Sequence, residues 1–409
     1  MTSLRLLALG TAGLALSWAC SGDDEQTTTG AGGIDWSGAG AGGASIGGSG
    51  PTGGAAPGAG GSAPGGGNVG GDATGGGGTG GAMPTGTVIA IAVGPTDGIT
   101  GESVAGAAWT STALGEGSIA RPALATVAGG DAVAMFLGGT AIRTVAWSGG
   151  AFGTPNEYAA GPAQGAPAFA TIAAAEHLAY HGADFLHYYD QGEPIAPTVT
   201  TQSFGPTPPS IAALPGEAVV AFAGDDGSLY AQSRSGGQWQ AAVNVVGSLA
   251  QRSPALVALT GNGPELLLAW VNHDPLSTDH TKVAFVTRSG AVWSAPALVG
   301  ADVFTGEDIA LGALPGGEAL LTYRGTDDKA YAVRYANGSW GVPQGIATPN
   351  PDVAAAPGVT AGVGGFDAEL CYAGSDGVAY HLRLDASGFT TPAAIGGSAL
   401  VYCAIAAIP

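Results

Sequence analysis

The chain has 409 residues, with 31 Asp plus Glu against 11 Lys plus Arg, and a formal net charge of −20 at pH 7. Such a chain repels nucleic-acid phosphates, and no Lys/Arg stripe opposes this, so we expect no nucleic-acid partner. Only 10% of the residues are charged. This favours many short, buried strands over long, solvated helices.

The first 20 residues have the features of an export signal. Arg5 supplies a positive charge, and Leu6–Leu16 form an apolar stretch too short to span a membrane. The segment ending at Cys20 resembles the lipobox of bacterial lipoproteins, although Ser17 stands where an aliphatic residue is usual. The resemblance implies that Cys20 is lipidated and that the protein lies in the bacterial cell envelope, facing the periplasm or the exterior. An ordinary secretory signal is the alternative.

Residues 21–85 consist almost entirely of Gly, Ala, Ser, Thr and Pro. This composition has too little apolar bulk to offset the entropy of ordering, so we expect a disordered linker. As a Gly-rich coil it would span roughly 40–50 Å and hold a folded domain clear of a membrane. The membrane would then be reached only through the lipid anchor.

The stretch Glu217–Gly247 shows the unit from which the rest of the chain is built. An apolar run opens at Glu217, breaks at Gly224–Gly227, resumes at Leu229, and turns again before Trp239. Glycine and aspartate favour the tight turns between such runs, so we expect a meander of three strands. A meander of this kind leaves apolar surface on both faces and cannot stand alone.

Copies of this unit recur from Thr87 onward. Each last strand opens with an aromatic residue, at Trp109, Phe152, Trp239, Trp293, Trp340 and Phe389. One unit near residues 191–197 lacks it, which makes seven units. Inner strands give the same count, with small-residue starts near Pro122, Pro167, Pro209, Pro254, Asp308, Pro357 and Ser398.

The first and last units are partial and complete each other. This is typical of a circular array, and repeats of 40–50 residues with four short strands are typical of a β-propeller. We therefore predict that residues 86–409 form an all-β, seven-bladed β-propeller of four-stranded antiparallel blades, closed by the N- and C-terminal strands. The repeat register predicts strands even in Thr171–Tyr180, where propensity alone favours a helix.

Charged residues recur with the same period. An acidic residue stands at the start of each second strand, at Asp131, Glu176, Glu217, Glu265, Glu318, and Asp367 or Glu369. Four arginines, Arg234, Arg288, Arg334 and Arg383, are expected at one register on the same face of the ring.

The segments Val283–Gly300 and Tyr331–Ile346 each join an arginine-bearing strand, a glycine turn, a tryptophan and a proline. This pattern resembles the repeat of bacterial seven-bladed propeller lectins that bind fucose and related sugars. It also looks like the turn of sialidase-type Asp-box propellers. The lectin resemblance implies a glycan or other cell-surface ligand held between blades, with candidate ligand-binding residues Arg234, Trp239, Arg288, Trp293, Arg334 and Trp340.

Structural roles are open for the same residues. The arginines would brace turns by pairing with the neighbouring acidic residues, and the tryptophans would pack between blades. No catalytic residue is assigned. A protein-docking scaffold and a sialidase-type hydrolase are the alternative functions, and the hydrolase would need arginines that converge at one point.

Two further features concern metal and disulfide chemistry. The inserted loop 272–280 carries His273, Asp274, Asp279 and His280, which are residue types that bind metals, and Asp225–Asp226 or Asp327–Asp328 could hold calcium. No cofactor is otherwise expected. Cys371 and Cys403 would form either a disulfide that staples the ring closure or two buried thiols. We expect a monomer.

Overall fold

The computed structural model describes residues 86–408, apart from 96–97, 105–108, 116, 128, 160–161, 173–174, 183–185, 191–192, 196–206, 251, 262, 274–281, 347–351 and 398. Within this part of the chain every regular element is a β-strand, so no described helix is long or apolar enough to cross a membrane. The predicted signal peptide, Cys20 and the linker 21–85 lie outside the described residues.

The strands form antiparallel sheets that follow one another along the chain. The terminal sheet joins β1 (Thr87–Val93), β2 (Gly98–Val104) and β3 (Thr110–Ala113) to β33 (Tyr402–Ile408). Next come β4 (Ala123–Thr126), β5 (Ala132–Gly138), β6 (Ala141–Ser148), β7 (Ala151–Phe152) and β8 (Asn156–Ala159). The third sheet holds β9 (Ala168–Ile172), β10 (Ala175–His181), β11 (Leu186–Asp190) and β12 (Glu193–Ile195).

A ten-stranded sheet occupies the middle of the chain. It contains β13 (Ser210–Leu214), β14 (Glu217–Ala223), β15 (Ser228–Ser235), β16 (Gln238–Trp239), β17 (Val243–Ala250), β18 (Ala255–Ala258), β19 (Leu266–His273), β20 (Val283–Ser289), β21 (Val292–Trp293) and β22 (Ala297–Leu298). Its two halves meet where β17 pairs with β19, through Leu249 opposite His273 and Ala250 opposite Asn272.

Two five-stranded sheets complete the ring. One holds β23 (Ala310–Leu314), β24 (Glu318–Arg324), β25 (Ala330–Ala336), β26 (Ser339–Trp340) and β27 (Gln344–Gly345). The other holds β28 (Gly358–Ala361), β29 (Ala368–Ala373), β30 (Ala379–Asp385), β31 (Gly388–Phe389) and β32 (Ala393–Gly396). We name each group of strands by its innermost strand, so that these two are the β23 group and the β28 group.

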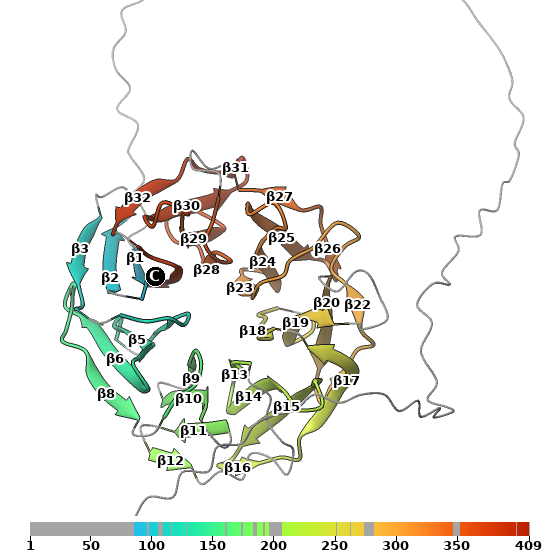
Figure 1. Ribbon diagram of the computed structural model, residues 1–409. Coiled ribbons are helices and arrows are strands. Elements are labelled where there is room, and N and C mark those ends of the chain that lie inside the picture. Colours follow the sequence, from blue (N-terminus) through green and yellow to red (C-terminus); the bar gives the residue numbers. More distant parts are fainter. Residues whose placement is uncertain are drawn as a thin grey trace, which may run out of the picture. The chain divides into compact units, whose positions relative to one another are not determined.

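The groups stand side by side around a common centre, which is the arrangement of a β-propeller (Figure 1). The inner strands contact one another in the order β33, β4, β9, β13, β18, β23, β28 and back to β33. They are rich in alanine and glycine because larger side chains would not fit where so many strands converge. At Gly358, for example, an added Cβ would lie 2.6 Å from the Cys403 carbonyl oxygen.

Strands from the two ends of the described chain close the ring, as predicted. β1 pairs with β33 along its whole length, from Thr87 opposite Ile408 to Val93 opposite Tyr402. A disulfide between Cys371 and Cys403 joins β29 to β33, with the two Cα atoms 5.8 Å apart. Of the two alternatives for these cysteines, the disulfide is the one present.

The number of separate sheets differs from the seven four-stranded blades that the sequence predicts. Among the described strands there are six sheets, because the β17–β19 pairing merges two strand groups into one sheet. Several groups also hold five strands, since their outermost strand is split into two short pieces, such as β26 and β27 beside β25.

The repeat register places individual strands correctly. β14 and β15 pair from Glu217 opposite Ser235 to Ala223 opposite Leu229, around the turn predicted at Gly224–Gly227. The stretch with helical propensity forms the hairpin of β9 and β10 instead. Burial on both faces outweighs local propensity there, since Leu178, Ala179 and Tyr180 are fully buried.

Candidate functional site

The four repeated arginines lie at two registers rather than one. Arg234 and Arg288 stand opposite the residue just after the acidic strand start, facing Ala218 and Leu266 across the ladder. Arg334 stands opposite Leu320, two residues after Glu318. Arg383 has the same offset, opposite Glu369 and two residues after Asp367.

Because successive side chains of a strand point to opposite faces, a shift of one residue reverses the direction of the arginine. Arg288 therefore points back to the preceding strand group, where it reaches Glu217. Arg334 points forward to the following group, where it reaches Asp367. The expectation of a single register was wrong for this reason.

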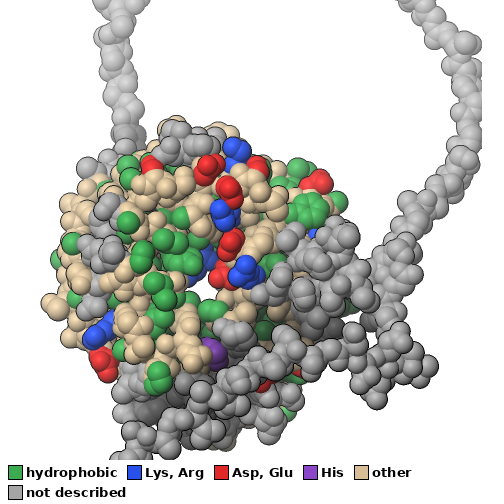
Figure 2. Space-filling model, in the orientation of Figure 1, with side chains coloured by type: hydrophobic (Ala, Val, Ile, Leu, Met, Phe, Trp, Pro, Cys, Tyr) green, Lys and Arg blue, Asp and Glu red, His purple; other side chains and the backbone are tan. Residues whose placement is uncertain are grey.

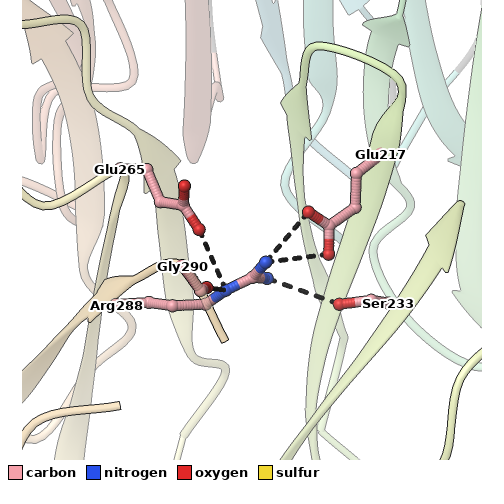
Figure 3. Close-up of polar contacts among 5 residues, drawn as sticks. All are labelled: Glu217, Ser233, Glu265, Arg288 and Gly290. Atoms are coloured by element: carbon pink, nitrogen blue, oxygen red, sulfur yellow. Dashed lines mark hydrogen bonds and ion pairs between the residues drawn. The ribbon is translucent and has the colours of Figure 1, made fainter. Parts of the chain in front are cut away.

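Arg288 is a buried brace between the β18 group and the β13 group (Figure 3). Its Nη2 donates to both carboxylate oxygens of Glu217 at 2.9 Å, and its Nη1 donates to Ser233 Oγ at 3.3 Å. Its Nε donates to the Gly290 carbonyl at 2.5 Å and lies 3.2 Å from Glu265 Oε1. Burial alone would raise the pKa of Glu217, but the hydrogen bonds from Arg288 and Ser233 lower it.

Arg334 makes a similar but open pair of contacts. Its Nε donates to Glu318 Oε2 at 2.6 Å, and its Nη1 donates to Asp367 Oδ2 at 2.7 Å. Burial would lower the pKa of Arg334, but the hydrogen bonds to Asp367 and Glu318 raise it. Its side chain is 42% exposed, against 9% for Arg288, so a ligand can reach Arg334 but not Arg288.

Arg383 belongs to a buried polar cluster beside the ring closure. Glu369 is fully buried, and its Oε2 accepts hydrogen bonds from Arg383 Nε at 3.1 Å and from His381 Nε2 at 2.7 Å. The guanidinium lies over the Phe366 ring, and the edge of Trp109 meets the His381 ring at 4.9 Å between centroids. These contacts tie Arg383 to the fold.

The candidate tryptophans pack between strand groups. Trp239 meets Tyr188 of the preceding group edge to face, with ring centroids 4.7 Å apart, and Trp340 meets Phe285 of its preceding group at 5.6 Å. Trp293 packs against the cluster of apolar residues shared by the β13 and β18 groups. The packing role that the sequence left open is therefore the one present for all three.

A pocket of about 300 Å³ opens between the β23 and β28 groups, and of the predicted ligand residues it contains Arg334. The β23 group contributes its floor and one wall, and the β30–β31 hairpin contributes the other. The lining residues are Leu320, Ala332, Arg334, Gly341, Val342, Gln344, Leu384, Asp385, Ala386, Ser387, Gly388 and Phe389.

The pocket combines a charged wall with an apolar surface. Leu320 and Leu384 are buried, Phe389 is half-buried, and Val342 at the edge is 81% exposed. In the facing hairpin, Asp385 Oδ1 accepts hydrogen bonds from the Ser387 backbone N–H and hydroxyl at 2.7 and 2.6 Å. These bonds lower the pKa of Asp385, so its carboxylate stays ionised.

The centre of the ring holds arginines that do not belong to the repeat. Arg121, just before β4, donates from Nη1 to the Ile309 carbonyl at 3.1 Å and from Nη2 to the carbonyls of Ala356 and Pro357. Ile309 precedes β23, and Ala356 and Pro357 precede β28. Arg121 thus links inner strands that are not neighbours, and burial lowers its pKa.

More charged side chains gather beside the central opening (Figure 2). Arg324 lies 3.4 Å from Glu307 Oε1 and 2.6 Å from Asp328 Oδ1, and Arg252 donates to the Gly306 carbonyl at 2.8 Å. These pairs balance their charges locally. Convergent arginines, which a sialidase-type site needs, are present here, but their contacts are to backbone carbonyls and carboxylates of the fold itself.

The metal candidates are divided by the structure. His273 ends β19, while Asp274, Asp279 and His280 lie outside the described residues, and no described residues cluster as a metal site. The other calcium candidates, Asp226 and Asp327, use their carboxylates within their own turns.

A recurring turn explains these aspartates. Asp226 accepts from Tyr230 Oη at 2.8 Å and from the Ser228 N–H at 2.9 Å. Asp327 and Asp376 make the same pair of contacts, with Tyr331 and Tyr380 as the phenol donors. The Gly-x-Asp-x-x-x-Tyr spacing is visible in the sequence and is the signal that could have identified these aspartates as turn residues.

No family model matches the chain, and no curated protein matches it. Among solved structures, a fucose-specific lectin from Aleuria aurantia aligns with a TM-score of 0.49 and 14% identity, over 68% of this chain and 96% of that chain. AofleA from Arthrobotrys oligospora aligns at 0.44 and 14%, over 64% and 86%. An ulvan lyase aligns at 0.45 and 11%, over 71% and 85%. At these TM-scores the alignments carry no conclusion about the ligand or activity of this chain.

Proposed function

We propose that this chain is a carbohydrate-binding module whose sugar site is the pocket between the β23 and β28 groups. The observation that carries the proposal is the composition of this pocket. It places a guanidinium, carboxylates, an amide and a hydroxyl around a half-buried phenyl ring. Sugars present hydroxyls that both donate and accept hydrogen bonds, together with apolar C–H faces, so this set of groups suits them.

The open contacts of Arg334 support this role. Among the described residues, none accepts from its Nη2, and only one oxygen each of Glu318 and Asp367 is used by Arg334. One sugar hydroxyl could accept from Nη2 while a neighbouring hydroxyl donates to a free carboxylate oxygen. A volume of about 300 Å³ is at the lower end for ligand sites and suits one sugar ring.

The test is glycan-array screening of the purified chain, followed by calorimetry on the best ligand with wild type and variants. We expect Arg334→Ala and Phe389→Ala each to weaken binding at least about tenfold, since both remove direct contacts. Ser339→Ala, in the β25–β26 turn outside the pocket, is the matched control. An array without any hit contradicts the proposal, and capture of a protein partner instead would favour a docking scaffold.

We further propose that the ring has seven blades, with the ten-stranded sheet counted as two. The support is that both β13 and β18 take places in the closed cycle of inner strands. The merged sheet arises from two residue pairs alone, between β17 and β19. An electron-density map of the ring at side-chain resolution tests the count.

We also propose that the protein is a monomer attached to the bacterial envelope through a lipid on Cys20. The support is the sequence: an apolar run ends at this cysteine and a Gly-rich linker follows. Mass spectrometry of the N-terminal peptide from membranes tests the anchor. A Cys20→Ala variant that stays in the membrane fraction would contradict it.

A further inference from the structure

The pocket carries more negative than positive charge. Arg334 is the one cation among its described lining residues, and it is paired with Glu318 and Asp367. A third carboxylate, Asp385, stands on the opposite wall. Together these four side chains carry a net charge of −2 at neutral pH.

We propose that the pocket selects saccharides without an acidic group and rejects those bearing a carboxylate, sulfate or phosphate. This inference rests on the proposed sugar site and specifies the class of sugar that it takes. An acidic sugar would have to compete with Glu318 and Asp367 for Arg334, and any partial success would leave one of these carboxylates unpaired.

The two carboxylates come from different strand groups, which makes the selection a property of the gap between them. Glu318 opens β24 in the β23 group, and Asp367 immediately precedes β29 in the β28 group. Their bonds to Nε and Nη1 hold the guanidinium at 2.6 and 2.7 Å on two sides. The formal charge of the whole chain, −20, adds a long-range repulsion of the same sign.

The experiment compares methyl glycosides of glucose, galactose and mannose with those of the corresponding uronic acids, which differ by one carboxylate. Binding to the purified full chain is measured by calorimetry at low ionic strength. We expect the best neutral glycoside to bind at least about tenfold more tightly than its uronate. A uronate that binds as tightly as its neutral partner would overturn the inference while leaving the sugar site intact.

Substitution then tests which residues select. Glu318→Gln and Asp367→Asn keep the shape of the side chains and remove their charge, so Arg334 is released to an acidic ligand. We expect each to shift the neutral-to-uronate affinity ratio toward the uronate by about threefold to tenfold. Glu265→Gln, beside Arg288 and outside the pocket, is the control and should leave the ratio unchanged. An equal shift in Glu265→Gln would contradict local selection.

A second measurement does not depend on the stability of the variants. If selection is by charge, added salt screens the repulsion. The wild-type ratio should therefore fall toward one between about 20 and 500 mM NaCl, while the affinity for the neutral sugar stays constant. A ratio that does not depend on salt would overturn the inference. If no glycoside in the panel or on the array binds, the sugar site itself is wrong.

Discussion

Arg288 provides the sharpest test of how the strand groups are held together. We predict that Arg288→Met lowers the free energy of unfolding by about 2–3 kcal/mol. The substitution removes a buried guanidinium that bonds to Glu217, Ser233 and Gly290 and pairs with Glu265. Removing one partner of a buried ion pair costs about 3–5 kcal/mol. The lower figure applies here because the Glu217 and Glu265 side chains are 21% and 35% exposed, so water partly replaces the lost bonds.

Urea unfolding followed by tryptophan fluorescence measures the change, with Arg334→Met as the matched control. The Arg334 side chain is 42% exposed, so its ion pairs are screened by solvent and the control should lose about 1 kcal/mol or less. A loss below about 0.5 kcal/mol in Arg288→Met, or an equal loss in both variants, would refute the reasoning.

The same variant should change the pH dependence of stability. The pKa of Glu217 is lower in the folded protein than its ordinary value of 4.5. Its contribution is therefore fully present above that ordinary value and is lost as the pH falls through the folded pKa. Arg288→Met removes a cause of the shift, so stability should fall less steeply in acid than it does in the wild type.

Two further predictions concern the ring closure and the turns. The Cys371–Cys403 bond closes a loop with a sequence separation of 32, so reduction or Cys403→Ser should cost about 3–4 kcal/mol in urea unfolding; two free thiols in mass spectrometry without reductant would contradict this. Gly325→Ala should cost about 1–3 kcal/mol, because its Cβ would lie 2.6 Å from Tyr331 Cε2 and 2.7 Å from Asp327 Oδ1. Gly263→Ala meets no atom within 4 Å and should be neutral in the same unfolding assay.

The fold could be predicted because it is written as a repeat. The small-residue starts near Pro209 and Pro254 mark β13 and β18, and the aromatic residues at Trp239 and Trp340 mark the outer strands. The merging of two groups through β17 and β19 could not be read, because it depends on where an outer strand ends in space.

The site was harder because one residue of offset decides direction. Arg288 stands five residues before Trp293, whereas Arg334 stands six before Trp340, and only this difference turns Arg334 toward the pocket. The spacing was readable, and treating the four arginines as equivalent concealed it. Asp385 and Phe389 could not have been assigned, because they reach the pocket from the next strand group.

The central claim is that a sugar binds between the β23 and β28 groups. A crystal structure of the chain with the tightest neutral glycoside tests it most directly. We predict density for one sugar ring against Phe389, within hydrogen-bond distance of Arg334 Nη2. Sugar density at the central opening beside Arg121 and Arg324, with an empty pocket at Arg334, would contradict the account.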